Sequence, residues 1–170
     1  MFTLPKELRA QGERAEADFR AWLDASGVAY MYIEQSPLTV PAGLRRRIKR
    51  PDYLVGIPYA GSLAFDVKAK SLSEGQLIFD HAEVDKLVRF ARLFNLTAYF
   101  ACLEPREAGR HWWVPLANLQ NQVPEWRNKR RVYCVPIATA FEVQTESLFL
   151  DAVLAFGRRA LAVEAASEAP

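Results

Sequence analysis

Several charged residues lie in segments of the sequence that are otherwise apolar. The stretch RPDYLVGIPYAGSLAFDVKAK, residues 50–70, carries Asp52, Asp66, Lys68 and Lys70. Side chains alternate between the two faces of a strand, so Asp66, Lys68 and Lys70 share one face. If the two strands of this stretch pair through the turn between them, Asp52 lies near Asp66. Two carboxylates brought together repel unless a proton or a cation compensates, and Mg²⁺ accepts such hard oxygen ligands. The alternative is that Asp52 ends a loop and pairs with Arg50 or a nearby arginine.

A third carboxylate, Glu16, falls on the apolar side of a helix predicted over residues 5–25. A helix turns about 100° per residue, so Leu23 lies about 20° and Phe19 about 60° from Glu16 around the axis. A carboxylate on a buried face is costly unless a cation or hydrogen-bond donors compensate it. We therefore expect Glu16 beside Asp52 and Asp66. The alternative is a glutamate satisfied by an arginine.

Basic residues gather at two places, although the net charge is only +2. The segment LRRRIKR, residues 44–50, supplies Arg45, Arg46, Arg47, Lys49 and Arg50, and the segment RNKRR, residues 127–131, follows Trp126. Basic clusters on a nearly neutral domain indicate a local anionic partner, nucleic acid first. The alternative for either cluster is a solvated loop. Trp126 either stacks on a base or packs against the protein.

Length and composition indicate the number of domains and the location of the protein. The chain has 170 residues, 51% of them hydrophobic, which predicts a single domain over residues 1–162 and a disordered tail over 163–170. No apolar run approaches the ~18 residues of a membrane span, and the N-terminus lacks an apolar signal segment, so we expect a cytoplasmic protein. Cys102 and Cys134 are expected to be buried free thiols.

Hydrophobic periodicity and turn residues predict an α/β domain around a mixed sheet. A first helix over residues 5–25 carries an apolar stripe of Leu8, Ala15, Phe19, Trp22 and Leu23. A second helix, over 81–94, is capped by Asp80 with Glu83 in a capping-box position and ends at Asn95; its stripe is Val84, Leu87, Val88, Ala91 and Phe94. Strands are predicted over 28–34, 52–57, 62–70, 97–104, 111–116 and, more weakly, 131–137. A last helix is predicted over 147–162.

The order Glu16, Pro51-Asp52, Asp66-Val67-Lys68 resembles the pattern E…PD…(D/E)xK of the PD-(D/E)xK nuclease superfamily. Three further segments are similar to archaeal Holliday junction resolvases: GERAEADFRAWLDASGVAYMYIE, HAEVDKLVRFARLFNLTAYFACLE and GRHWWVPL. The resemblance covers about residues 11–119. Two features depart from the resolvases: Asp66 stands where they usually have Glu, and the PAGLRRRIKR loop is longer and more basic.

This resemblance implies a restriction-endonuclease-like core, with a central mixed β-sheet flanked by helices and a C-terminal helix. It also implies a metal-dependent endodeoxyribonuclease that uses Mg²⁺, with Mn²⁺ as a substitute. Asp52, Asp66 and the carbonyl of Val67 would hold the ion, and Glu16 would bind a second ion or an outer water. Lys68 would orient or activate the attacking water, or stabilise charge on the phosphate. Lys70 would contact phosphate or stand in for Lys68.

The expected function is therefore hydrolysis of DNA phosphodiester bonds, including those of branched DNA, in recombination, repair or defence. The basic residues of segment 44–50 would lie at the mouth of the metal site and hold the DNA backbone. Two alternatives stay open: a non-catalytic nucleic-acid-binding or assembly subunit, and a nuclease acting on RNA or single-stranded DNA. Junction resolvases work as dimers, so the resemblance also implies a homodimer, for which the helix at 149–161 is apolar enough to pair.

Overall fold

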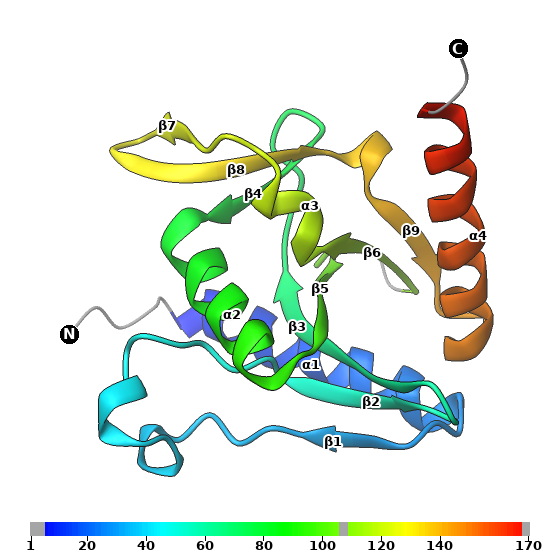
Figure 1. Cartoon of the computed structure of the whole chain (residues 1–170), viewed down its shortest axis with the longest axis horizontal. Helices are drawn as coiled ribbons and strands as arrows, with labels where there is room; N and C mark the ends of the chain where they lie inside the picture. The colour runs from blue at the N-terminus through cyan, green and yellow to red at the C-terminus, as the bar shows by residue number, and fades with distance from the viewer. Residues whose placement is uncertain (1–5, 106–108, 168–170) are drawn as a thin grey trace.

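The computed structural model describes residues 6–105 and 109–167 (Figure 1). Its helices and strands follow one another along the chain as α1 (Lys6–Ala25), β1 (Tyr30–Tyr32), η1 (Pro37–Thr39), η2 (Ala42–Leu44), β2 (Tyr53–Ile57), β3 (Gly61–Ala69), β4 (Gln76–Asp80), α2 (His81–Phe94), β5 (Thr97–Leu103), β6 (Arg110–Pro115), α3 (Leu116–Gln120), β7 (Glu125–Arg127), β8 (Arg130–Pro136), η3 (Ile137–Thr139), β9 (Phe141–Gln144) and α4 (Phe149–Ser167).

The strands form two sheets. The larger sheet has six strands in the order β1-β2-β3-β5-β6-β9, and the smaller one has the order β4-β8-β7. Only β3 and β5 pair in parallel, and every other pair in the larger sheet is antiparallel, so this sheet is mixed. The predicted fold class, a mixed central sheet flanked by helices with a C-terminal helix, is confirmed.

The two faces of the larger sheet carry separate cores. On one face, α1 and α4 pack over the strands, and the buried side chains include Phe19, Trp22, Phe65, Trp113 and Phe149. On the other face, α2, α3 and the smaller sheet pack over them, and the buried side chains include Phe79, Leu87, Phe100, Trp112 and Tyr133. Residues of β3 alternate between these two cores, as the period of a strand requires. A polar side chain on β3 can therefore face α2.

The helix ends follow the sequence signals. Asp80 accepts hydrogen bonds from the backbone N–H groups of Ala82 and Glu83 and so caps α2, and Asn95 takes the left-handed conformation after its last residue. Two long-range hydrogen bonds tie α1 to α4: Trp22 Nε1 donates to the carbonyl of Ser147, and the backbone N–H of Phe149 donates to Ser26 Oγ.

The structure corrects several details of the sequence prediction. The strands β4, β7 and β9 and the short helix α3 were not predicted, and β1 is shorter than the strand expected over 28–34. Leu8 and Phe94 are exposed, so their assignment to buried stripes was wrong. The last helix runs to Ser167, which places 163–167 in a helix instead of the expected tail; 168–170 lie outside the described residues.

Two other expectations concern cysteines and membranes. Cys102 is buried, Cys134 is half-buried, and both are free thiols. Among the helices of residues 6–105 and 109–167, none combines the length and apolar character needed to cross a bilayer.

Candidate active site

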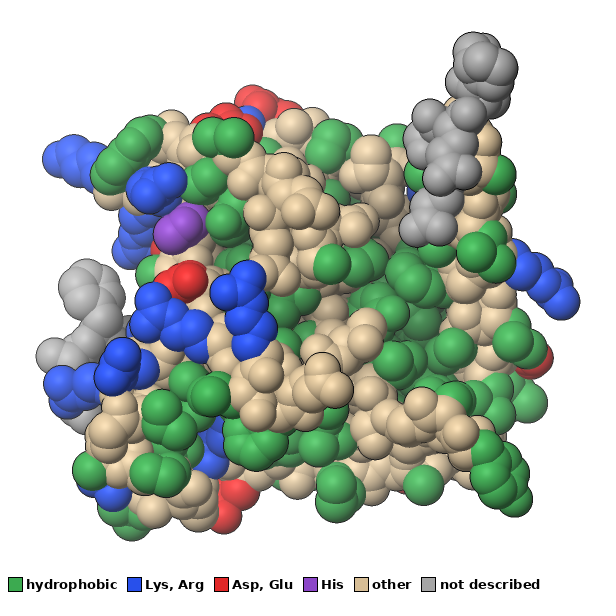
Figure 2. Space-filling model, in the orientation of Figure 1, with side chains coloured by type: hydrophobic (Ala, Val, Ile, Leu, Met, Phe, Trp, Pro, Cys, Tyr) green, Lys and Arg blue, Asp and Glu red, His purple; other side chains and the backbone are tan. Residues whose placement is uncertain are grey.

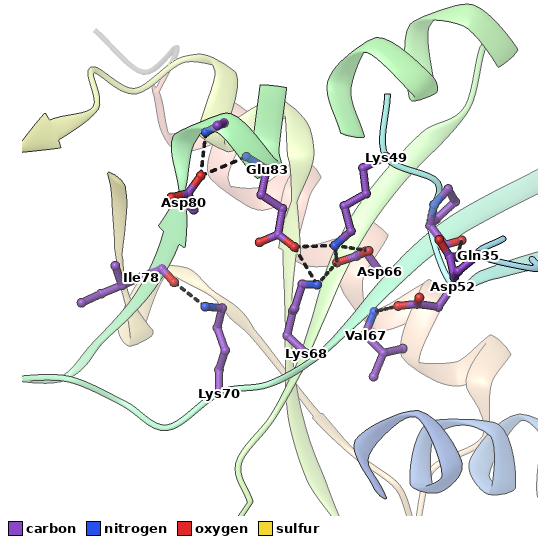
Figure 3. A network of polar contacts seen from close by, with 12 residues as sticks. Gln35, Lys49, Asp52, Asp66, Val67, Lys68, Lys70, Ile78, Asp80 and Glu83 are labelled. Atoms are coloured by element: carbon purple, nitrogen blue, oxygen red, sulfur yellow. Dashed lines mark hydrogen bonds and ion pairs between the residues drawn. The ribbon is translucent and has the colours of Figure 1, made fainter. Parts of the chain in front are cut away.

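Asp52 and Asp66 are brought together by the pairing of β2 with β3. Tyr53 lies opposite Phe65, and continuing that antiparallel register by one residue places Asp52 opposite Asp66. Both carboxylates are buried, with 7% of Asp52 and none of Asp66 exposed. Asp52 Oδ2 accepts a 2.7 Å hydrogen bond from the backbone N–H of Val67, whose side chain packs in the core on the α1 side (Figure 3).

Two lysines neutralise Asp66. Lys49 Nζ lies 2.8 Å from Asp66 Oδ1 and 2.9 Å from Oδ2, and Lys68 Nζ lies 2.8 Å from Oδ2. Both ammonium groups also contact Oε1 of Glu83, from the first turn of α2 (Figure 3). Two carboxylates and two ammonium groups thus form a closed network, which we call the Asp66 network: Lys49, Asp66, Lys68 and Glu83.

The electrostatics of this network keep Lys68 charged. Burial alone would lower the pKa of the Lys68 ammonium, but the negative charges of Asp66 and Glu83 outweigh burial and raise that pKa. Burial would likewise raise the pKa of Glu83, but the positive charges of Lys68 and Lys49 lower it to about 2. Lys68 is therefore an ammonium, not a free amine, at neutral pH.

Asp52 behaves differently because no ammonium group of the described residues is bonded to it. Burial, and then the negative charge of Asp66, raise the pKa of Asp52 to about 7, although the hydrogen bond from Val67 lowers it. A carboxyl group with such a pKa loses its proton readily when a cation is supplied beside it. A perturbed carboxylate next to a second buried carboxylate is typical of a functional site.

Glu16 approaches the same region from α1. Glu16 was expected on the buried face of its helix, and the structure shows it half-buried. Burial raises the pKa of Glu16, while the nearby charges of Lys68 and Asp66 lower and raise it respectively. The backbone carbonyl of Glu16 accepts a 3.0 Å hydrogen bond from the hydroxyl of Tyr53, which fixes this turn of α1 against β2.

The aspartates have the chemistry for a hard divalent cation, but the side chains do not form a ready cage. Among the described residues, no three or more His, Cys, Asp or Glu side chains cluster in a way that could hold a metal ion. Yet Asp66 Oδ1 is buried and receives no hydrogen bond from residues 6–105 or 109–167, because Lys49 contacts it only as an ion pair. Asp52 and Asp66 thus fit an ion that keeps several waters, as Mg²⁺ does.

A basic cavity of about 530 Å³ adjoins the Asp66 network. Its lining includes Lys49 and Glu83 from the network, together with Arg45, Arg46, Arg50, Lys86 and Arg130. Figure 2 shows Lys and Arg side chains gathered on the left of the molecule, the side on which Figure 1 places α2 and the loop before β2. An anionic ligand in this cavity would be surrounded by positive charge and would reach the Asp66 network at Lys49.

The predicted basic residues do not all take part in this cavity. Arg47 is exposed but outside the cavity lining, and Arg50 also holds the loop by donating to Thr39 Oγ1 and the carbonyl of Ser36. Lys70 is half-buried and donates to the carbonyl of Ile78, so it lies against β4 and not in the Asp66 network (Figure 3). Lys49, expected to hold DNA, lines the cavity and is also a member of that network.

Sequence reasoning missed two contributors to the site. Glu83 was interpreted as a capping residue, yet its side chain contacts Lys49 and Lys68. Lys86 was given no role, although it lies three residues further along α2 and lines the same cavity. The one available signal was helical spacing, since residues three apart on a helix lie on the same side.

Known proteins similar to this chain are found among solved structures. Neither a protein-family model nor a curated protein matches the chain. Among solved structures, the chain is similar to Archaeoglobus fulgidus Hjc, a Holliday junction resolvase from an archaeal hyperthermophile. The two share 27% identity over 72% of this chain and 87% of that chain, with a TM-score of 0.49. A TM-score below 0.5 assigns no activity, so the function proposed below rests on the residues of the site.

Proposed function

We propose that this protein is a Mg²⁺-dependent endonuclease that hydrolyses phosphodiester bonds of DNA. The observation that carries the proposal is the pair of buried carboxylates, Asp52 and Asp66, that lies beside a charged lysine and a basic cavity. Buried like charges are costly, and a structural core gains nothing from placing them together. A cation-binding role accounts for the pair.

Asp52, Asp66 and the carbonyl of Val67 would hold the ion, and Glu16 would hold a second ion or a water beside it. A bound Mg²⁺ would polarise the phosphoryl oxygen and make a nucleophile available near neutral pH. Lys68, because it remains protonated, stabilises the negative charge that grows on the phosphate and does not remove a proton from water. The arginines of the cavity orient the DNA backbone.

The lysines of the Asp66 network also have a role before substrate arrives. Without a divalent ion, Lys49 and Lys68 are the counter-ions of Asp66. Once Asp66 has another counter-ion, these ammonium groups are available to the phosphate that enters the cavity. Lys49 and Lys68 thus compensate the carboxylate in the free protein and the phosphate in the complex.

A cleavage assay tests this function. The protein is incubated with branched, duplex and single-stranded DNA in the presence of Mg²⁺, Mn²⁺ or EDTA. The motif resemblance to junction resolvases makes branched DNA the first substrate to try. We expect cleavage with Mg²⁺ or Mn²⁺ and none with EDTA. Absence of cleavage of every substrate with both metals would overturn the proposal.

One observation favours a second candidate, a non-catalytic nucleic-acid-binding or assembly subunit. Asp66 is already neutralised by two lysines, and no metal cage is formed among the described residues. Calorimetric titration with Mn²⁺ separates the two candidates, because the nuclease binds Mn²⁺ through Asp52 and Asp66. Loss of that binding in the Asp52→Asn variant is expected for the nuclease. A protein that retains DNA binding but takes up no Mn²⁺ is the binding subunit.

A further inference from the structure

The strands β7 and β8 form a hairpin that projects beyond the body of the protein, on the same side as α2 (Figure 1). Its turn consists of Asn128 and Lys129, both with positive φ (47° and 64°), which is the two-residue turn that matches the twist of paired strands. β8 also pairs with β4, with Val132 opposite Asp80, the residue that caps α2. The hairpin is thus fixed to the helix that supplies Glu83.

Trp126 stands on this hairpin outside both hydrophobic cores of the part of the chain that the structure describes. It lies opposite Arg131, and alternation along β8 puts Arg131 on the same face as Tyr133 and Val135, which are buried. Trp126 and Arg131 therefore lie on the face of the hairpin that is turned towards the core. They extend past the end of the core, however, and 72% of Trp126 is exposed. The other three tryptophans are buried. Of the two roles that the sequence allowed for Trp126, packing in the core does not occur among the described residues.

The hairpin also carries positive charge that is not neutralised locally. Lys129, Arg130 and Arg131 are exposed, and none of them forms an ion pair with another described residue. Arg127 differs, because it is held by the side chains of Gln76 and Glu125. Arg130 lines the same cavity as Arg45 and Arg46, so the hairpin contributes a basic side chain to the cavity beside the Asp66 network.

We propose that the β7–β8 hairpin is a DNA-binding arm that takes a strand with unpaired bases. One base stacks on the exposed ring of Trp126, a neighbouring phosphate contacts Arg131 on the same face of the hairpin, and a phosphate further along the strand contacts Arg130 at the cavity. An aromatic ring beside basic side chains suits this ligand, because stacking uses the face of the base and the cations use the backbone. This inference rests on the proposed function and extends it: the substrate region next to the site contains unpaired nucleotides.

Two measurements in EDTA, where no cleavage occurs, test the arm. The first is fluorescence anisotropy with a labelled oligo(dT) strand. Stacking on one base predicts that Trp126→Leu weakens binding roughly 5- to 150-fold, while Trp126→Phe retains most of the affinity. Replacing Arg130 and Arg131 with alanine should reduce the log–log salt slope by about 0.7 for each lost contact on a single strand. Tyr59→Ala, at an exposed aromatic of the β2–β3 turn, and Arg158→Ala, on α4, are the matched controls.

The second measurement is tryptophan emission during the same titration. Since Trp126 alone among the four tryptophans is exposed, oligo(dT) should quench wild-type emission and leave the emission of Trp126→Phe unchanged. If the wild type binds the strand with no quenching and Trp126→Leu binds equally well, the hairpin is not a DNA-binding arm, although the protein does bind DNA. If the wild type binds neither single-stranded nor branched DNA, both the arm and the proposed function fail.

Discussion

Asp66 is the most constrained residue of the candidate site, since it is fully buried and contacts two ammonium groups. Replacing it with alanine would leave Lys49 and Lys68 with Glu83 alone and would destabilise the fold, because breaking a buried ion pair strands the remaining charge. Asp66→Asn keeps the shape and removes the charge. If Asp66 holds the ion, we expect Asp66→Asn and Lys68→Ala each to reduce the cleavage rate at least about 100-fold, the scale of losing one transition-state charge contact.

This experiment needs two controls: proof that each variant is folded, and a variant that removes a carboxylate outside the site. Circular dichroism and urea unfolding establish that each variant is folded at the assay temperature. Asp85→Asn, which removes a surface carboxylate of α2 that pairs with Arg89, should cleave at the wild-type rate. Glu16→Gln should weaken cleavage as well. Full activity in Asp66→Asn would place the chemistry at another site.

His111 gives the fold a pH dependence that is separate from the site. Burial lowers the pKa of His111 to about 3, and its ring packs against Phe19 and Trp22. The unfolded chain binds the proton near pH 6.5, so this contribution to stability is complete above pH 6.5 and is lost as the pH falls from there towards 3. At about 1.4 kcal/mol per pH unit, His111 should cost the wild type about 2 kcal/mol between pH 6.5 and 5. Urea unfolding at the two pH values should show a smaller loss in His111→Phe; equal losses would contradict the assignment.

At the scale of elements, the loop before β2 brings basic residues to the cavity. Arg45 and Arg46 line it, and Arg47 is exposed beside them. Each phosphate that such a residue neutralises releases counter-ions, so affinity falls with salt. Replacing the three arginines with alanine should weaken binding to all DNA sequences and reduce the log–log slope on duplex DNA by roughly two to three units, at about 0.9 per contact.

A second triple variant, which loses the same charge outside the loop, shows whether the loop arginines themselves cause the change in salt dependence. Arg9, Arg92 and Arg158 are exposed on α1, α2 and α4, and replacing these three with alanine changes the net charge by the same amount. Salt titrations followed by anisotropy compare the two triple variants. An unchanged slope in the loop variant, or an equal change in both, would show that the loop does not contact DNA.

The sequence predicted those helices and strands that are long enough to show a hydrophobic period and that carry their own start and stop residues. The helix α2 has a cap, a period and a left-handed stop within one segment, and all three occur in the structure. The short elements β7, β9 and α3 have three to five residues, too few for a period to show. In the site, pairing of two adjacent strands through a turn predicted that Asp52 lies near Asp66, with an ion pair to Arg50 as the alternative. Lys49 and Glu83 could not be paired this way, because 34 residues separate them and only tertiary packing brings them together.

At the scale of the whole molecule, α4 leaves an apolar surface uncovered. Leu150, Leu154 and Leu161 are exposed, and at 100° per residue they lie within about 40° of one another around the helix axis. α4 lies at the edge of the molecule away from α2 and the hairpin (Figure 1), so a partner on α4 would leave the cavity open. In a dimer with a two-fold axis, the apolar stripe of one α4 packs against the same stripe of the second copy, and such dimers are the commonest homo-oligomers.

We therefore expect a homodimer through α4, which Leu154→Arg converts to a monomer. A charge placed in a buried apolar seam has no partner in the symmetric contact, because the second copy presents the same arginine. Sedimentation velocity over a range of protein concentrations measures the change in mass. Leu93→Arg on α2 is a close control, since its leucine is 59% exposed against 60% for Leu154. A wild-type protein that sediments as a monomer at every concentration, or a Leu154→Arg variant that remains dimeric, would exclude α4 as the interface.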